Sequence, residues 1–267
     1  MFDREREITE LLLRTGGDVL MASRGRSLDV TAKRSSSDIV TPADVSSERA
    51  MLAALQREAP DDGVLCEESG FRAAESGEDV WVLDPLDGTV NYVTGLNEFG
   101  VIVGLTRRGS PIVGGMYLPV TGDLYFAARG CGALHNGVRI SVSATERVED
   151  AVFDHSLSNL ETVLAAQDLT LQALVRRARG VRCIQSLTYL ARVAEGIYDG
   201  LVYHSLGLWD ICGPSVILEE AGAEVVDLTG APLDLAPGPW ATNRVYAAAA
   251  ANPVLLEQLL SVIKLPD

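Results

Sequence analysis

The sequence predicts a mixed α+β chain with two successive lobes. Near the N-terminus, apolar residues recur at helical spacing; in the middle, apolar runs alternate with short turns; after residue 150, helix-like and strand-like segments follow one another. With 267 residues, 47% of them hydrophobic, the chain can form a sizeable core. We expect an N-terminal α+β lobe over residues 1–145 and a C-terminal α/β lobe over residues 146–267.

Two helices are expected before the first strands. One covers residues 8–19, and the other begins near Ser47 and ends near Glu58. Each places its apolar side chains on one face, as a helix that packs against a sheet does. These side chains are Ile8, Leu11, Leu12 and Val19 in the first helix, and Ala50, Met51, Ala54 and Leu55 in the second.

An antiparallel meander is expected next, because apolar runs are separated by the glycine-containing turns Arg107–Ser110 and Val120–Asp123. Residues 141–150 are predicted to join the two lobes. The expected meander strands are 99–105, 111–117 and 124–128; the second lobe is expected to have helices over 160–177, 187–195 and 253–264, a helix beginning near Asp210, and strands over 200–203 and 224–227.

The segment from Trp81 to Tyr92 gives the clearest indication of function. Its apolar strand is expected to stop at Pro85, because proline lacks the N–H that a sheet ladder needs. In the turn that follows, Asp84, Asp87 and the Leu86 carbonyl can converge on one point, and such an all-oxygen ligand set suits Mg²⁺. A helix beginning directly after the turn would direct backbone N–H groups to the same point. The alternative is a solvated turn, since Asp-Pro and Asp-Gly are common turn dipeptides.

Three further segments contribute acidic residues. Glu67 and Glu68 follow a short apolar stretch, and because successive strand side chains point to opposite faces, only one of them is expected to face a given site. Asp210 is expected to be the N-cap of the helix that follows it. Asp44 is either a turn or capping residue, or the hydrogen-bond partner of Thr89, whose hydroxyl it would orient toward a water.

Taken together, these segments resemble the inositol monophosphatase family of metal-dependent, lithium-sensitive phosphatases. The resemblance extends over nearly the whole chain, and the motifs DPLDGT and WD are its most specific pair. It implies the layered αβαβα sandwich of the inositol monophosphatase and fructose-1,6-bisphosphatase type. The matching segments are Asp38–Asp44, Glu67–Ser69, Asp84–Asn91, Phe126–Ala133 with Asn136 and Gly137, and Trp209–Asp210 with the Glu-Ala-Gly sequence at 220–222.

The resemblance also implies individual roles and two or three Mg²⁺ ions per site. Thr89 and Asp44 are implied to position the attacking water, with Glu67 as a further catalytic residue. The implied reaction is direct attack of a metal-activated water on a phosphate monoester, without a phosphoenzyme. The implied metal ligands are Glu67, Asp84, the Leu86 carbonyl, Asp87 and Asp210; the implied substrate-binding residues are Leu86, Asp87, Gly88, Thr89, Ser186, Tyr203 and Asp210.

Two departures from the family pattern concern the substrate. Members that prefer inositol phosphates have an acid seven positions before the WD aspartate, where this chain has Tyr203. A small Gly-[Ser/Thr]-Ala stretch of many members is replaced here by residues 184–187, which include Ser186. The predicted substrate is inositol monophosphate or a related cyclitol or sugar phosphate. The alternatives are histidinol phosphate, fructose 1,6-bisphosphate, 3′-phosphoadenosine phosphate or NADP, and, from another class, a non-catalytic regulatory role.

Composition restricts location and partners. The net charge of −15 argues against nucleic-acid binding, and no segment is long and apolar enough to span a membrane. The charged segment Asp3–Glu7 is unlike a signal peptide, and four cysteines without metal-site spacing fit a reducing cytoplasm. We expect a cytoplasmic protein that acts on a small phosphorylated metabolite, and the resemblance implies a homodimer.

Overall fold

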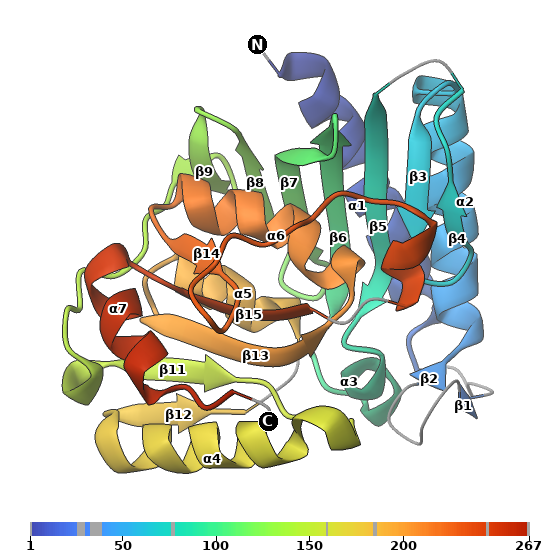
Figure 1. Ribbon diagram of the computed structural model, residues 1–267. Helices are drawn as coiled ribbons and strands as arrows, with labels where there is room; N and C mark the ends of the chain where they lie inside the picture. The colour runs from blue at the N-terminus through green and yellow to red at the C-terminus, as the bar shows by residue number, and fades with distance from the viewer. Residues whose placement is uncertain are drawn as a thin grey trace.

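Two β-sheets alternate with layers of helices in the computed structural model, which describes residues 2–25, 30–32, 39–75, 78–158, 160–183, 186–243 and 246–265 (Figure 1). An eight-stranded sheet is formed by residues 63–139, and a five-stranded sheet by residues 152–251. A two-stranded sheet, β1 (Thr31–Ala32) and β2 (Ile39–Val40), lies near one end of the larger sheet.

The larger sheet has the strand order β10-β9-β8-β7-β6-β5-β3-β4. β3 and β5 are parallel, and the other neighbouring strands are antiparallel. The expected meander of β6, β7 and β8 is therefore extended by three further strands, β5 on one side and β9 and β10 on the other. The strands are β3 (Gly63–Cys66), β4 (Gly70–Arg72), β5 (Asp79–Asp87), β6 (Gly100–Arg107), β7 (Ser110–Leu118), β8 (Asp123–Ala128), β9 (Gly132–His135) and β10 (Val138–Arg139).

The smaller sheet has the strand order β12-β11-β13-β15-β14. β11 is parallel to both of its neighbours, while β15 is antiparallel to β13 and β14. A 3₁₀ turn (Val148–Asp150) precedes the first strand, and a second one (Pro239–Asn243) precedes the last. The strands are β11 (Val152–His155), β12 (Gly180–Arg182), β13 (Gly200–Leu206), β14 (Glu224–Val226) and β15 (Tyr246–Ala251).

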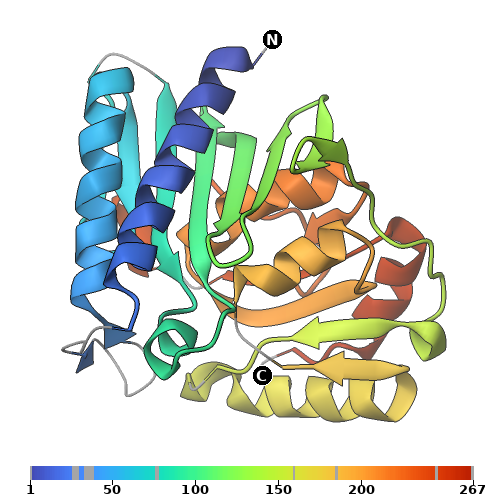
Figure 2. The same ribbon diagram turned by 180° about the vertical axis from the view of Figure 1, so that it is seen from behind.

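The helices form three layers around the two sheets. α1 and α2 cover one face of the larger sheet, as Figure 2 shows, and α5 and α6 fill the space between the sheets. α4 and α7 pack on the far face of the smaller sheet, and the short α3 follows β5. Their bounds are α1 (Asp3–Ser23), α2 (Pro42–Glu58), α3 (Thr89–Thr94), α4 (Glu161–Arg177), α5 (Leu187–Ala194), α6 (Leu208–Glu220) and α7 (Pro253–Val262).

Alternation of side chains along the strands explains the layers. In β5, Val82 faces the core shared with α5 and α6, whereas Trp81 and Leu83 face the core shared with α1 and α2. In β6, Ile102 and Val103 divide in the same way. Apolar side chains on both faces require a helix layer on each side, so the αβαβα order predicted from the resemblance is confirmed.

Most predicted elements are present, with shifted ends. The second helix begins at Pro42 instead of Ser47, because Thr41 accepts a hydrogen bond from the Ala43 N–H and starts the helix earlier. The strands β11, β12 and β15 were not predicted from the sequence. The division into lobes near residue 145 stays a prediction. None of the helices in the described ranges combines the length and apolar character needed to cross a lipid bilayer.

The prediction that the strand stops at Pro85 was wrong. β5 continues to Asp87, and its register against β6 shifts between Asp84 and Asp87. This irregularity removes the need for a ladder hydrogen bond at Pro85, since proline is tolerated where pairing is interrupted. This register shift determines where the carboxylates of Asp84 and Asp87 lie at the end of β5.

Candidate active site

The backbone turns sharply after β5, and glycine makes that turn possible. Gly88 has φ +82, and a Cβ at this position would lie 2.8 Å from the Glu98 carbonyl oxygen. Any other residue would therefore be strained and would collide with the main chain. α3 begins at the next residue, Thr89, so the predicted helix start after the turn is confirmed.

α6 brings a third acid to the same place from the second half of the chain. Its backbone packs directly on β6 and β7. A Cβ on Gly213 would lie 2.4 Å from the Val103 carbonyl oxygen, and a Cβ on Gly114 would lie 1.9 Å from the Gly213 carbonyl oxygen, so neither position has room for a side chain. The first turn of the helix carries Asp210. Glycines on both sides of this contact therefore set the position of Asp210.

Asp210 is not the N-cap of α6, which corrects the prediction. The helix begins at Leu208 with Gly207 as N-cap, and Asp210 Oδ2 accepts the Gly207 N–H at 2.7 Å. Asp44 does the same in α2, where its Oδ2 accepts the Thr41 N–H at 2.9 Å. A carboxylate at the third helical position accepts a backbone N–H at the start of the helix, as the side chain of an N-cap residue also does. The sequence pattern therefore does not distinguish the third helical position from the N-cap position.

Asp84, Asp87 and Asp210 form one group of carboxylates. One ligand oxygen from each lies within 4.8 Å of the others, and Asp84 is 1% exposed. Burial, followed by the charges of Glu67, Asp87 and Asp210, raises the pKa of Asp84 well above its usual range. Burial and the Asp210 charge likewise raise the pKa of Asp87.

This group fits a divalent cation. Three carboxylates at one point repel one another, and in the described part of the chain no arginine or lysine forms an ion pair with Asp84 or Asp87. A hard cation would offset that repulsion and accept the oxygen ligands offered there. The predicted meeting of Asp84 with Asp87 is present, and Asp210 joins them.

The start of α5 holds Asp87 from the other side. The Leu187 N–H donates to Asp87 Oδ1, and the Ser186 hydroxyl also hydrogen-bonds to this carboxylate; both lower its pKa. Ser186 is the N-cap of α5 and accepts the Thr188 N–H at 3.2 Å. The predicted substrate-binding residue Ser186 therefore positions Asp87. Ile184 and Gln185, which precede it, lie outside the described residues, as does Asp38.

The predicted hydrogen bond between Thr89 and Asp44 is present. Thr89 Oγ1 lies 3.1 Å from Asp44 Oδ1 and also 3.1 Å from the Leu86 carbonyl oxygen. A hydroxyl has one hydrogen, so it donates to only one of these two acceptors at a time. Asp44 is held by Thr41, whose N–H and hydroxyl both donate to Oδ2, and burial raises the pKa of Asp44 despite these bonds.

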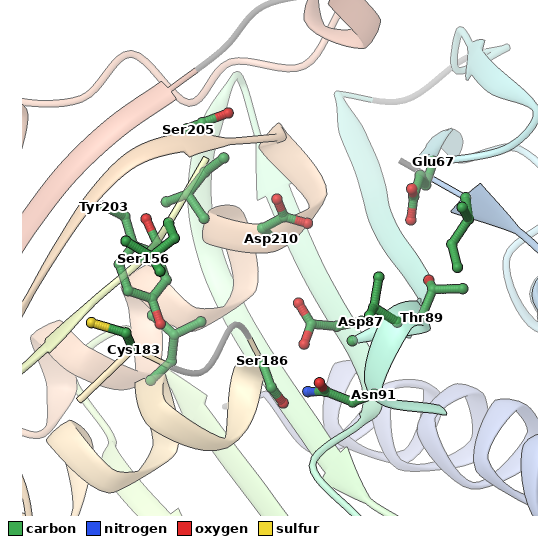
Figure 3. Close-up of a pocket in the computed structure, with 16 residues that line it drawn as sticks. Glu67, Asp87, Thr89, Asn91, Ser156, Cys183, Ser186, Tyr203, Ser205 and Asp210 are labelled. Carbon is green, nitrogen blue, oxygen red and sulfur yellow. The ribbon is translucent and has the colours of Figure 1, made fainter. Parts of the chain in front are cut away.

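These elements surround a pocket of about 380 Å³ (Figure 3). Glu67 and Thr89 lie on one side of it, and Tyr203, Ser156 and Cys183 lie on the opposite side. Of the two adjacent glutamates, Glu67 lines the pocket, while Glu68 is not among the lining residues. The lining residues are Ile39, Glu67, Asp87, Gly88, Thr89, Val90, Asn91, Ser156, Leu157, Cys183, Ser186, Leu190, Tyr203, Ser205, Leu206 and Asp210.

Sequence reasoning missed several of these residues. Ser156 and Leu157 follow β11, Cys183 follows β12, and Ser205 lies in β13, and none belongs to a motif. Their common signal is position, since the carboxyl ends of the parallel strands β12, β11 and β13 meet at one edge of the smaller sheet. Recognising β11 and β12 in the sequence would have identified that edge.

The fold and the pocket define a class of protein in which two sheets and three helix layers enclose a site rich in carboxylates. The family profile described as "Inositol monophosphatase family" matches residues 3–264. The chain belongs to the inositol monophosphatase family, a family of phosphatases, and the predicted resemblance is confirmed.

Individual relatives agree with this assignment. The "Fructose-1,6-bisphosphatase/inositol-1-monophosphatase" of Aquifex aeolicus is 34% identical over 265 residues, which cover 97% of this chain and 94% of the relative. The "Nus factor SuhB" of Pasteurella multocida is 30% identical over 254 residues, covering 94% and 92% of the two chains. The crystal structure of the extragenic suppressor protein suhB from Bartonella henselae superposes with a TM-score of 0.89 at 28% identity, covering 96% of this chain and 97% of that one.

Proposed function

We propose that the protein is a magnesium-dependent phosphomonoesterase that hydrolyses inositol monophosphate or a related small cyclitol or sugar phosphate. The observation that carries this proposal is the convergence of Asp84, Asp87 and Asp210. Of these, Asp87 and Asp210 line the pocket together with Thr89 and Glu67. Like charges that separate elements bring together raise the free energy of the folded protein. A bound divalent cation would offset this repulsion and could take part in phosphate hydrolysis.

The proposed ligands of two or three Mg²⁺ ions are Asp84, Asp87, Asp210, Glu67 and the Leu86 carbonyl. Asp84 accepts a hydrogen bond from the Leu86 N–H, and Asp87 accepts one from the Leu187 N–H. The main chain therefore orients both carboxylates before a cation binds. When bound, magnesium supplies positive charge for the phosphate and lowers the pKa of a water. The backbone N–H groups of Gly88 and Thr89 are proposed to hold phosphate oxygens.

The residues Asp44 and Thr89 would orient the attacking water. If the Leu86 carbonyl serves as a ligand, the Thr89 hydroxyl keeps Asp44 as its acceptor, 3.1 Å away. The lone pairs of Thr89 Oγ1 are then left to accept a hydrogen from water, which directs the water oxygen toward phosphorus. Attack by water in this position needs no covalent enzyme intermediate.

Phosphate release with magnesium tests the proposal. The substrates are inositol 1-phosphate, fructose 1,6-bisphosphate, histidinol phosphate, 3′-phosphoadenosine phosphate and NADP, and the latter four are the alternatives that share this chemistry. Asp87→Asn should abolish release, whereas Asp168→Asn, which removes an equal charge from the exposed face of α4, should leave it unchanged. Release from none of these substrates would contradict the proposal.

A second candidate is a regulatory role without catalysis. It is favoured by one observation, the 30% identity over most of the chain to a relative named "Nus factor SuhB". Under this alternative, Asp87→Asn would leave the biological role intact while removing any phosphate release. We further propose a cytoplasmic homodimer that is inhibited by lithium; sedimentation and inhibition of the magnesium-dependent rate test these two properties.

A further inference from the structure

A buried carboxylate lies directly behind one wall of the pocket, outside the group of acids described above. Asp154 is in β11, is 0% exposed, and is not among the residues that line the pocket. Its Oδ2 accepts the hydroxyl hydrogen of Tyr203, which is in the neighbouring strand β13 and does line the pocket. The pair therefore connects the pocket wall to a carboxylate in the strand behind it.

The charge of Asp154 has little to offset it. Oδ1 is buried without a hydrogen-bond partner, and in the described part of the chain no cationic side chain forms an ion pair with this carboxylate. Burial raises the pKa of Asp154 to about 7, and the hydrogen bonds from Tyr203 and from the main chain of His155 only partly oppose that rise. A hydrogen-bond donor or a positive charge placed against Tyr203 would therefore be favoured.

The end of the pocket near Tyr203 differs from the end near the three acids. Ser156, Cys183 and Ser205 surround Tyr203 there, on the side opposite Glu67 and Thr89 (Figure 3). The lining residues, all of them in described ranges, include no arginine, lysine or histidine. In the described structure, this end consequently offers oxygen and sulfur atoms to an occupant and no cationic side chain to a second phosphate.

We propose that Asp154 sets substrate specificity through Tyr203, an inference that rests on the proposed phosphatase function. Because the Tyr203 hydrogen is directed to Asp154, the Tyr203 oxygen is left to accept a hydrogen bond from the alcohol portion of the substrate. Asp154 is a positioning residue, and its charge adds a preference for a cationic donor over a neutral one. The favoured substrates are phosphate monoesters whose alcohol portion carries hydroxyl or amine donors, and a second phosphate is disfavoured.

Relative specificity constants test this inference. The probes are inositol 1-phosphate, histidinol phosphate and fructose 1,6-bisphosphate, each compared in the same variant with p-nitrophenyl phosphate, whose alcohol portion carries no hydrogen-bond donor. Ratios within one variant do not depend on how much of the protein is folded. The wild-type protein should favour inositol 1-phosphate and histidinol phosphate over the bisphosphate.

Two variants separate orientation from charge. Tyr203→Phe removes the accepting oxygen and should raise KM about tenfold for inositol 1-phosphate and histidinol phosphate, with little change in kcat. Asp154→Asn keeps an oxygen that can accept the Tyr203 hydrogen but removes the charge, so it should raise KM for histidinol phosphate more than for inositol 1-phosphate. Tyr117→Phe is the control, because Tyr117 lies in β7 of the larger sheet and does not line the pocket, and it should leave all ratios unchanged.

The outcomes distinguish this inference from the proposed function. Phosphate release with ratios that neither Tyr203→Phe nor Asp154→Asn changes would overturn the role of Asp154 alone. A wild-type preference for the bisphosphate would do the same. If the wild-type protein releases phosphate from none of the four compounds, the proposed function is contradicted, and this inference, which rests on it, is contradicted as well.

Discussion

Thr89 Oγ1 lies 3.1 Å from Asp44 Oδ1, and this contact joins the first turn of α2 to the first residue of α3. The two residues are 45 positions apart, and Asp44 is fixed independently by two hydrogen bonds from Thr41. A carboxylate held in this way can determine which direction the Thr89 hydroxyl points. The interaction is a property of the fold that exists before any substrate binds.

The first prediction concerns this pair. Asp44→Ala and Thr89→Val should each lower kcat by about a hundredfold, with a smaller effect on KM, because each removes the orientation of the water. If the two residues act as one unit, the double variant should be little worse than either single variant. Steady-state kinetics on all three variants provides the measurement, and additive losses would contradict a shared role.

The second prediction concerns the contact of α6 with the larger sheet. Gly213→Ala should lower the free energy of unfolding by about 3 kcal/mol, because its Cβ would lie 2.4 Å from the Val103 carbonyl oxygen. Gly180→Ala is the matched control, since a Cβ there meets its nearest side-chain atom at 3.4 Å. Urea unfolding measures both. If the two variants lose the same stability, close packing at Gly213 does not position α6.

These contacts show which parts of the site could be predicted from the sequence and which could not. The DPLDGT and WD motifs identified Asp84, Asp87 and Asp210, because their residue types and order carry the chemistry. The sequence did not show that Gly213 and Gly114 allow α6 to reach the sheet, since a glycine's contacts depend on an element far away in the chain. Asp154 was missed for the same reason, because its partner Tyr203 lies 49 positions away in the neighbouring strand.

The errors in the prediction have local causes. Asp210 was taken for a cap because a carboxylate at the third helical position satisfies the same turn from a different place. The end of β5 was placed at Pro85 because a register shift that tolerates proline depends on the neighbouring strand β6. The first error arises within one helix, whereas the second concerns a register that the neighbouring strand decides and that propensities of a single segment do not describe.

The third prediction concerns stability at acid pH. His155 is 0% exposed, and its ring centroid lies 5.3 Å from that of His204. Among the residues that the structure describes, neither ring nitrogen of His155 has a hydrogen-bond partner. Burial and the nearby His204 lower the pKa of His155 to about 4. Between that value and the usual pKa of about 6.5, the unfolded chain binds the proton and the folded protein does not, so stability is lost as the pH falls.

His155→Phe should remove this dependence. Between pH 7 and pH 5, the wild-type protein should lose about 2 kcal/mol of unfolding free energy more than the variant does. Asp154, whose pKa is raised, contributes in the opposite direction, but it is present in both proteins and cancels in the difference. Urea unfolding at the two pH values measures this difference, and equal losses in the two proteins would show that His155 does not titrate in this range.

The last prediction separates stability from metal binding at the three acids. Without magnesium, Asp84→Asn should be more thermally stable than the wild-type protein, because it removes one of the charges that repel one another within 4.8 Å. A gain of about 1 kcal/mol corresponds to roughly 3 °C in a chain of this size. Magnesium should raise the Tm of the wild-type protein and have little effect on the variant, because the cation stabilises the folded state only where its ligands are intact. Calorimetric melting with magnesium and with chelator measures both effects. If the variant is the less stable protein in chelator, repulsion among these carboxylates does not dominate the site, and the argument that a cation is needed to offset it fails.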